Sequence, residues 1–399
     1  MQHVQPKRDS FYLEDEQWLK GRNIITFVAL IGIAACAAGF ALDRTQFFRS
    51  YLVSFCFAVT ILLGGMFFVM VQYLTGSAWS ITVRRFMETL IAGMPVAVLL
   101  FIPVALGVNE LYEWTHADVI AREAVVRAKA GYLNQGFFSF RGLAYITLWS
   151  IWALAIYGQS TKQDRERSAA QMNACSRWSA PGLLLVTLTG TLASFDWIMS
   201  LDPKWYSTIF GLYCLSGGAL AFFGVLTLIA LGMRRAGVLA NSITSEHYHD
   251  LGKWMFALTV FWAYIAFSQY LLIWYANLPE ETIFYRMRMA GSWKWISAVI
   301  LFCRFILPFV VLIFRASKRN LTVLGIAAGW VVAMHFIDMY WLIMPVFSKS
   351  GVAPSWMDLG TLVGVIGVFG YAFWLRLRKR ALVPVGDLRF EQGLNFENI

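Results

Sequence analysis

Long apolar runs separated by short polar segments make up most of the chain. Each run approaches the roughly 20 residues that a helix needs to cross about 30 Å of hydrocarbon. The fourth run is short, and we expect its helix to begin near Phe137. The pattern predicts an all-α polytopic membrane protein with about ten transmembrane helices. The predicted spans are 24–42, 51–74, 86–106, 143–158, 181–200, 208–232, 254–276, 293–314, 321–344 and 356–376.

The composition agrees with a membrane protein, because 59% of the residues are hydrophobic and only 14% are charged. A soluble domain carries about 25% charged residues. The net charge of +10 does not indicate nucleic-acid binding, since the basic residues lie in short loops between apolar runs. Lys and Arg concentrate at both ends and in the even-numbered loops, which predicts that both termini are cytoplasmic.

Three pieces lie outside the predicted membrane spans, which belong to a transmembrane domain of residues 24–376. Segment 1–23 is polar and lacks the apolar stretch of a cleaved signal peptide, so we expect a cytoplasmic N-terminal segment. Segment 107–142 is expected to be a long external connection with a helical middle. Segment 377–399 is expected to be a polar cytoplasmic tail. None of the three is long enough to form an enzyme domain.

A faint internal repeat relates the two halves of the predicted membrane domain. Ser194–Met199 of the fifth span resembles Phe336–Trp341 of the ninth, and each contains one aspartate. Four helices separate the two copies, so they run through the membrane in the same direction. The repeat predicts two parallel four-helix bundles, at about 51–200 and 208–344, with the first and last helices peripheral.

Ionisable side chains inside the predicted spans are the most informative residues, because each costs about 2.5–3.5 kcal/mol at a helix centre. Arg304 is near the middle of the eighth span, and Asp196 and Asp338 lie toward the outer ends of theirs. His335 precedes Asp338 by three residues and shares its helix face. Glu88 lies near the inner end of the third span. Each has two interpretations, either a member of a proton path or a static, satisfied polar contact.

The seventh span adds polar residues, Tyr264 and Gln269, that either conduct protons through water or bond neighbouring helices. We hypothesise that protons move between Glu88 on the inner side and Asp196, His335 and Asp338 on the outer side. Arg304, Tyr264 and Gln269 would then occupy the middle of that path.

Resident cofactors are not expected. The five cysteines are scattered singly, whereas iron–sulfur and structural zinc sites need clustered thiolates. A membrane haem needs a pair of histidines at membrane depth, and His335 is the one candidate. The string Glu246–Asp250 is better explained as a helix cap with a solvated, protonatable surface than as a metal site. Nucleotide-binding and hydrolase motifs are missing from the sequence.

Several segments resemble a known family. These are Phe195–Pro203, the long run from His249 to Thr282, Gly64–Met66, Trp79–Ser80 and Arg84–Arg85. They are similar to the ActF type of NrfD-like (polysulfide-reductase-type) membrane subunits of bacterial alternative complex III. The resemblance spans nearly the whole chain. It implies ten helices in two four-helix bundles, in the bacterial cytoplasmic membrane.

The resemblance also implies a role. Alternative complex III oxidises a quinol, usually menaquinol, and passes electrons through iron–sulfur clusters and c-type haems that other subunits bind. The implied partners are a homologous NrfD-like subunit, an iron–sulfur/molybdopterin-like subunit, c-type cytochromes, a terminal oxidase and lipids. The chain itself would support the quinol-oxidising module and provide a candidate proton path. The alternatives are a secondary transporter, which parallel repeats also suit, and a purely structural membrane anchor.

Overall fold

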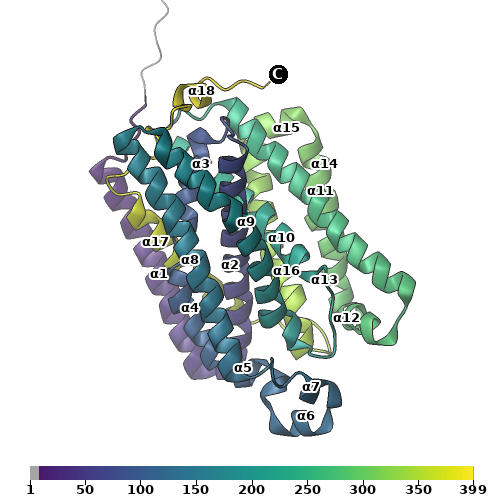
Figure 1. The fold of residues 1–399 in the computed structure, drawn as a ribbon. Helices are drawn as coiled ribbons and strands as arrows, with labels where there is room; N and C mark the ends of the chain where they lie inside the picture. The colour runs from purple at the N-terminus through teal and green to yellow at the C-terminus, as the bar shows by residue number, and fades with distance from the viewer. Residues whose placement is uncertain (1–8, 399) are drawn as a thin grey trace, which may run out of the picture.

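The computed structural model describes residues 9–398, and all regular secondary structure in that range is helical (Figure 1). Nine of these helices are long and apolar enough to cross a membrane, and the number is ten if a bent helix pair is counted as one span. The predicted class, an all-α multi-pass membrane protein, is therefore confirmed.

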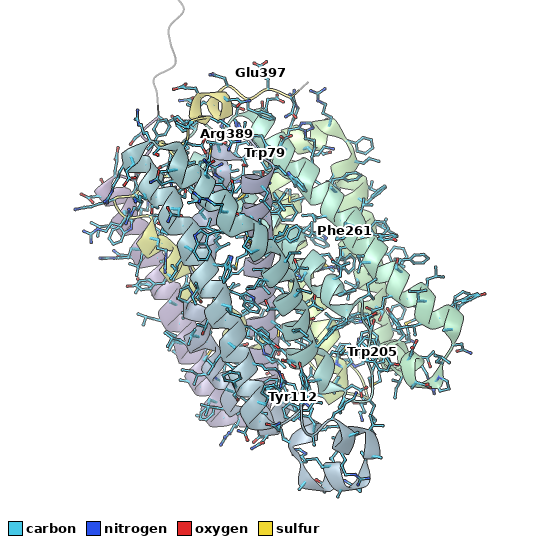
Figure 2. The ribbon with its side chains drawn as sticks, viewed as in Figure 1. Trp79, Tyr112, Trp205, Phe261, Arg389 and Glu397 are labelled. Atoms are coloured by element: carbon cyan, nitrogen blue, oxygen red, sulfur yellow. The ribbon has the colours of Figure 1, made fainter. Side chains whose placement is uncertain are left out.

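The two ends of the helices define two sides of the molecule. Arg389 and Glu397 lie on the side that also carries the N-terminal segment, here called the terminal side (Figure 2). Phe11 accepts a backbone hydrogen bond from Leu382 there, so the two ends of the described chain meet. Tyr112 and the small helices that follow it lie on the opposite side (Figures 1 and 2).

The first bundle consists of α2, the bent pair of α3 and α4, α8, and α9. The bent pair changes direction by 42° at a break over residues 92–95, which ends at Pro95, a residue without a backbone N–H to continue the helical hydrogen bonds. The helix α8 begins close to the expected Phe137 and extends far enough to include Arg141. The bounds are Arg44–Leu74 for α2, Ile81–Ile91 for α3, Val96–Leu106 for α4, Gln135–Glu166 for α8 and Ala169–Trp197 for α9, which a short 3-10 turn η2 (Met199–Leu201) follows.

The second bundle consists of α10, α11, a composite span, and α16. The composite span is interrupted by a π-helical turn, η3, that contains Arg304. Wide turns of this kind are rare and often occur at functional sites. The bounds are Phe210–Arg235 for α10, Ser245–Ala276 for α11, Trp293–Val299 for α13, Ile300–Ile306 for η3, Leu307–Ile313 for α14 and Leu321–Phe347 for α16.

The first and last spans, α1 (Asp15–Leu42) and α17 (Trp356–Arg376), pack along each other beside the bundles. Their closest approach requires glycine, because a Cβ on Gly32 would lie 2.3 Å from the Cα of Gly364. Small residues that let two backbones approach are typical of helix pairs in membranes.

The two bundles meet where α2 packs against α10. A Cβ on Gly218 would lie 2.2 Å from the carbonyl oxygen of Thr60, and one on Gly64 would lie 2.5 Å from the Cα of Ala219. The bundles are therefore joined through backbone-to-backbone contact, and side chains from one bundle reach directly into the other.

Short helices cap both sides. On the side opposite the termini, α5 to α7 form a small projecting lobe within the expected external connection (Figure 1). The remaining bounds are Val108–Leu111 for α5, Glu113–Thr115 for the 3-10 turn η1, Ala117–Arg122 for α6, Ala124–Ala128 for α7, Pro279–Met289 for α12, Arg315–Arg319 for α15 and Phe390–Leu394 for α18.

The C-terminal segment is packed onto the terminal side rather than extending away as a polar tail. Its apolar stretch, 381–383, is buried. Asp387 pairs with Arg84 of the first bundle. The Gly393 carbonyl accepts a hydrogen bond from His247 Nε2 of the second bundle, at 2.9 Å. The segment thus bridges the two bundles.

Candidate functional site

The composite span and α16 bring three of the predicted residues together. Arg304 Nη2 lies 3.2 Å from Asp338 Oδ2 and 3.2 Å from His335 Nδ1. Tyr213 of α10 donates its hydroxyl proton to Asp338 Oδ1 at 2.6 Å. We call these four residues the Arg304 cluster. Its side chains are buried, so its charges have protein partners rather than lipid, as the energetic cost of an exposed charge requires.

Arg304 lies in the π-helical turn η3, where side chains from other helices contact both the backbone and the guanidinium. Pro308 lacks the N–H that a wide i→i+5 turn would aim at the Cys303 carbonyl. The indole N–H of Trp330 supplies that missing donor, at 2.7 Å from the Cys303 oxygen. The Arg304 guanidinium also lies 4.3 Å from the ring centroid of Trp262, a favourable cation–π distance.

His335 connects the Arg304 cluster to the first bundle. Its Nε2 lies 2.9 Å from Thr60 Oγ1, and its ring lies 5.4 Å from that of Phe57. Because Nδ1 faces a guanidinium donor, it must accept, which places the proton of a neutral ring on Nε2. That proton is donated to Thr60, whose own hydroxyl donates to the Cys56 carbonyl at 2.8 Å.

The Arg304 cluster is incompletely satisfied. Arg304 Nε and Nη1, and Asp338 Oδ2, have no hydrogen-bond partner among the residues that the structure describes. Buried polar atoms without partners are uncommon in proteins, and ordered water or a ligand often explains them. Asp338 Oδ2 is thus held only by its ion contact to Arg304 Nη2, and Arg304 Nε and Nη1 retain N–H groups that can donate to a water molecule.

The matched aspartate of the first bundle is fully satisfied. Arg141 binds Asp196 through two parallel hydrogen bonds, from Nε at 2.8 Å and Nη2 at 3.0 Å. Its third nitrogen donates to the Tyr132 carbonyl, and Tyr145 donates a further bond to Asp196. A bidentate pair of this kind is strong and geometrically fixed. The same position in the repeat is thus a static ion pair in one bundle and an open cluster in the other.

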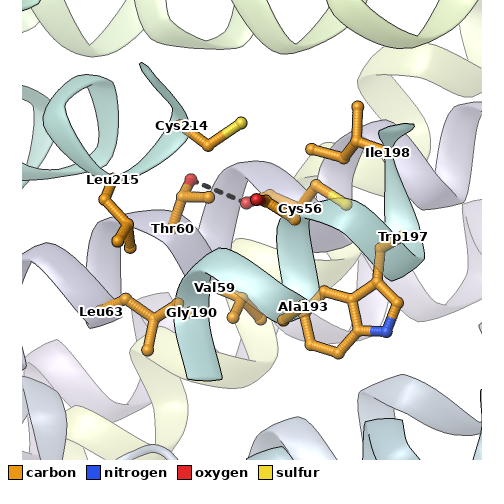
Figure 3. A pocket seen from close by; sticks show the side chains of 11 residues that line it. Cys56, Val59, Thr60, Leu63, Gly190, Ala193, Trp197, Ile198, Cys214 and Leu215 are labelled. Atoms are coloured by element: carbon orange, nitrogen blue, oxygen red, sulfur yellow. Dashed lines mark hydrogen bonds between the residues drawn. The ribbon is translucent and has the colours of Figure 1, made fainter. Parts of the chain in front are cut away.

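A small cavity lies between the two aspartate sites, at the contact of α2, α9 and α10 (Figure 3). Its volume of about 10 Å³ is close to the minimum for one water molecule. Thr60, the partner of His335, lines it on one side, and Ser194 and Trp197, neighbours of Asp196, line it on the other. Thr60 and Ser194 bring the only hydroxyl groups of a mainly apolar lining, so a water molecule held there would have Thr60, at the end of the His335–Thr60 chain, as one of few polar partners.

Glu88 lies apart from these residues, on the terminal side of the first bundle. Its carboxylate accepts hydrogen bonds from Tyr73 and Ser160, both at 2.6 Å, and also contacts Arg84 Nε at 3.3 Å and Arg85 Nη1 at 3.6 Å. The side chain is fully buried. Glu88 is therefore a satisfied group at the centre of an ion-pair network.

Tyr264 and Gln269, the two polar residues named for the seventh span, do not lie on one face of α11. Tyr264 is 65% exposed, whereas Gln269 is buried. Five residues correspond to about 140° around a helix, so the two side chains face different directions. Tyr264 therefore lies outside the Arg304 cluster. Gln269 remains a buried polar group, with one oxygen that no described residue binds.

The histidine string at the start of α11 is a helix cap, as the sequence indicates, but it is not a solvated surface. Thr244 and His247 form a reciprocal cap, and the C-terminal segment covers His247 through Gly393. His249 and Asp250 are also buried. Across residues 9–398, no group of three or more potential metal ligands comes together.

Neither a family model nor a curated protein matches the chain. The resemblance to ActF-type subunits is therefore still an expectation, and the site has to be interpreted from its own geometry.

Several residues that form the site are not among those predicted from the sequence. Arg141 falls in the expected external connection if the fourth helix starts at 143, but inside the helix if it starts near Phe137. Tyr213 and Thr60 carry no charge, so the energetic signal that marks Arg304 does not mark them. A membrane-depth carboxylate does require a partner, and that requirement is the signal that could have found Arg141.

Proposed function

We propose that the chain is an NrfD-like membrane subunit of a quinol-oxidising complex of the alternative complex III type, and that the Arg304 cluster is its proton-handling site. The arrangement of eight spans in two four-helix bundles, with α1 and α17 beside them, supports this assignment. Under this proposal both termini are cytoplasmic and the membrane is the bacterial inner membrane. Iron–sulfur clusters and c-type haems would belong to partner subunits, and menaquinol would be oxidised next to this chain.

The single observation that carries the proposal is the contrast between the two aspartates. Asp196 uses both of its oxygens in bonds to Arg141 and Tyr145, whereas Asp338 keeps one oxygen without a hydrogen bond. Protonation of Asp196 would break a charge-assisted hydrogen bond of a bidentate pair, whereas protonation of Asp338 at Oδ2 breaks a single ion contact of 3.2 Å. Asp338 can accept a proton at Oδ2 while Tyr213 still binds Oδ1.

The proton step follows from the contacts. A proton that reaches Asp338 Oδ2 converts the carboxylate to a carboxylic acid and releases Arg304 from its ion contact. Arg304 can then donate to a water molecule. A second route opens once Arg304 has moved away from His335 Nδ1, because His335 can then take a proton at Nδ1 and give the Nε2 proton to Thr60. Thr60 passes its own proton to water in the adjacent cavity. Quinol oxidation next to the subunit would have to bias these steps.

The test compares proton-to-electron ratios in reconstituted complexes that carry Asp338→Asn or Asp196→Asn. We expect Asp338→Asn to lower the ratio while quinol oxidation continues. Asp196→Asn should leave the proton-to-electron ratio unchanged. This variant is measured only on the fraction that elutes as a folded complex. Unchanged ratios in both variants would remove the proton-handling proposal. Purification of the chain without haem-containing partners would instead argue against the assignment to the complex.

A structural anchor is the second candidate, and Glu88 favours it. Tyr73, Ser160 and two arginines satisfy Glu88, so this end of the hypothesised path is sealed. If Asp338→Asn left proton translocation intact, the buried charges would be explained as helix-joining contacts alone.

A further inference from the structure

An apolar groove runs between the α1–α17 pair and the two bundles. Its volume is about 590 Å³, within the range of ligand sites in proteins. Residues from α1, α2, α10 and α17 line it, among them Ile24, Ile61, Val225 and Phe369. Its floor includes Phe57, whose ring contacts His335.

The lining is chemically uniform. None of the side chains that line the groove carries a charge. Trp374 brings the one lining N–H donor, and that indole already donates to the Trp18 carbonyl at 2.9 Å. A quinone head group would find no hydrogen-bond partner here, whereas a hydrocarbon chain needs none. The groove therefore fits an acyl chain.

Two cations lie around Trp18, whose backbone carbonyl accepts a hydrogen bond from the lining residue Trp374. The guanidinium of Arg22 lies 5.3 Å from the Trp18 ring centroid, and that of Arg378 lies 4.7 Å from it. Trp18 is held in place because it also donates to the Trp374 carbonyl at 3.2 Å. Arg22 immediately follows the lining residue Gly21. The two arginines are thus gathered around one indole beside the groove.

Neither arginine has a carboxylate partner. Arg22 donates to the neutral side chain of Asn23, and neither guanidinium forms an ion pair with a carboxylate in the described part of the chain. The acidic residues of α1 lie in its first turn, farther from the groove. Arginine is suited to bind phosphate with two parallel hydrogen bonds. Basic sites at the end of a membrane helix recognise anionic lipid head groups.

We propose that this groove binds an anionic phospholipid, with an acyl chain along the apolar lining and its phosphate between Arg22 and Arg378. The bound lipid fills the space between the α1–α17 pair and the bundles. It also covers Phe57, so it separates His335 from the surrounding bilayer. This inference is independent of the proposed proton chemistry, because it uses other residues and another face of the protein.

The test is native mass spectrometry of the full-length chain, delipidated in detergent and titrated with phosphatidylglycerol or phosphatidylcholine of the same acyl length. We expect the first lipid adduct to form at several-fold lower concentration with phosphatidylglycerol. The double variant Arg22→Gln/Arg378→Gln should remove that preference. Arg165→Gln, which removes an exposed cation elsewhere on the terminal side, should keep it. Equal binding of the two lipids to the unaltered chain would overturn the proposal, as would a preference that survives in the double variant.

A second variant tests the groove itself. Gly232 lines the groove, and a Cβ there would meet nothing within 4 Å. Gly232→Phe should therefore fill the groove without disturbing the fold, and should abolish the tight adduct. Gly158→Phe is the control, since Gly158 is equally unobstructed but lies on the exposed surface of α8. If Gly232→Phe released menaquinone and left phosphatidylglycerol bound, the groove would be a quinone site and the lipid proposal would be wrong.

Discussion

Thr60 Oγ1 lies 2.9 Å from His335 Nε2, and this contact joins the first bundle to the Arg304 cluster of the second. It is made possible by the close packing of α2 on α10, where glycines replace side chains. The two bundles are thus coupled at membrane depth through one hydrogen bond between a hydroxyl and an imidazole.

Thr60→Val should destabilise the protein by about 1–3 kcal/mol, because it leaves the buried His335 Nε2 proton without an acceptor. Thermal unfolding in detergent measures the effect. Thr227→Val is the matched control, since the Thr227 hydroxyl bonds only the Phe223 carbonyl of its own helix. Equal effects of the two substitutions would show that the Thr60–His335 contact contributes nothing of its own.

Removing one partner of the Arg141–Asp196 pair should destabilise the protein by about 3–5 kcal/mol, since a buried charge is left uncompensated. Replacing both, as Arg141→Met/Asp196→Leu, should cost much less than the sum of the single substitutions. A double-mutant cycle on the free energy of unfolding gives the coupling. Additive effects would contradict a direct, desolvated pair.

Gly218→Ala should separate the bundles. The new methyl group would approach the Thr60 carbonyl to 2.2 Å, and overpacking of this kind costs about 1–3 kcal/mol. The measurement is the yield and thermal stability of the folded protein. Gly329→Ala on α16 is the control because a Cβ there meets nothing within 4 Å, and the prediction is wrong if both variants behave alike.

The membrane spans follow from the sequence because their physical requirement is local. About 20 apolar residues are needed for each crossing of the membrane. That number does not depend on which helices lie next to the span or on how the span is rotated about its axis. The start of α8 is harder to place, since Arg141 is polar and its partner Asp196 lies in another helix. Only the folded protein shows that the pair is buried.

The site is less predictable than the spans, because side-chain partners depend on how each helix is rotated. The three-residue spacing of His335 and Asp338 correctly indicates a shared face, and both reach Arg304. The five-residue spacing of Tyr264 and Gln269 does not give a shared face. The π-helical turn around Arg304 depends on Trp330 of another helix, so local sequence does not determine it.

The contact between the C-terminal segment and the bundles should depend on pH through Asp387. Burial raises the pKa of Asp387, but the charge and hydrogen bond of Arg84, together with the backbone N–H and charge of Arg389, outweigh burial and hold that pKa below its ordinary value of 3.8. Because the folded pKa is the lower one, the stabilisation is complete above pH 3.8 and is lost as the pH falls through the folded value. The segment should therefore remain attached at neutral and mildly acidic pH.

Hydrogen exchange of residues 384–398 measures this attachment. We expect strong protection that is constant from pH 7 to pH 5, after correction for the intrinsic exchange rate. Asp387→Asn should lower the protection throughout that range, because Arg84 then loses its charged partner in the C-terminal segment. Glu397→Gln changes an exposed carboxylate of the same segment and should leave protection unaltered. Protection that falls between pH 7 and pH 5 in the unaltered protein would assign the attachment to a group of higher pKa, such as the His247 contact to Gly393.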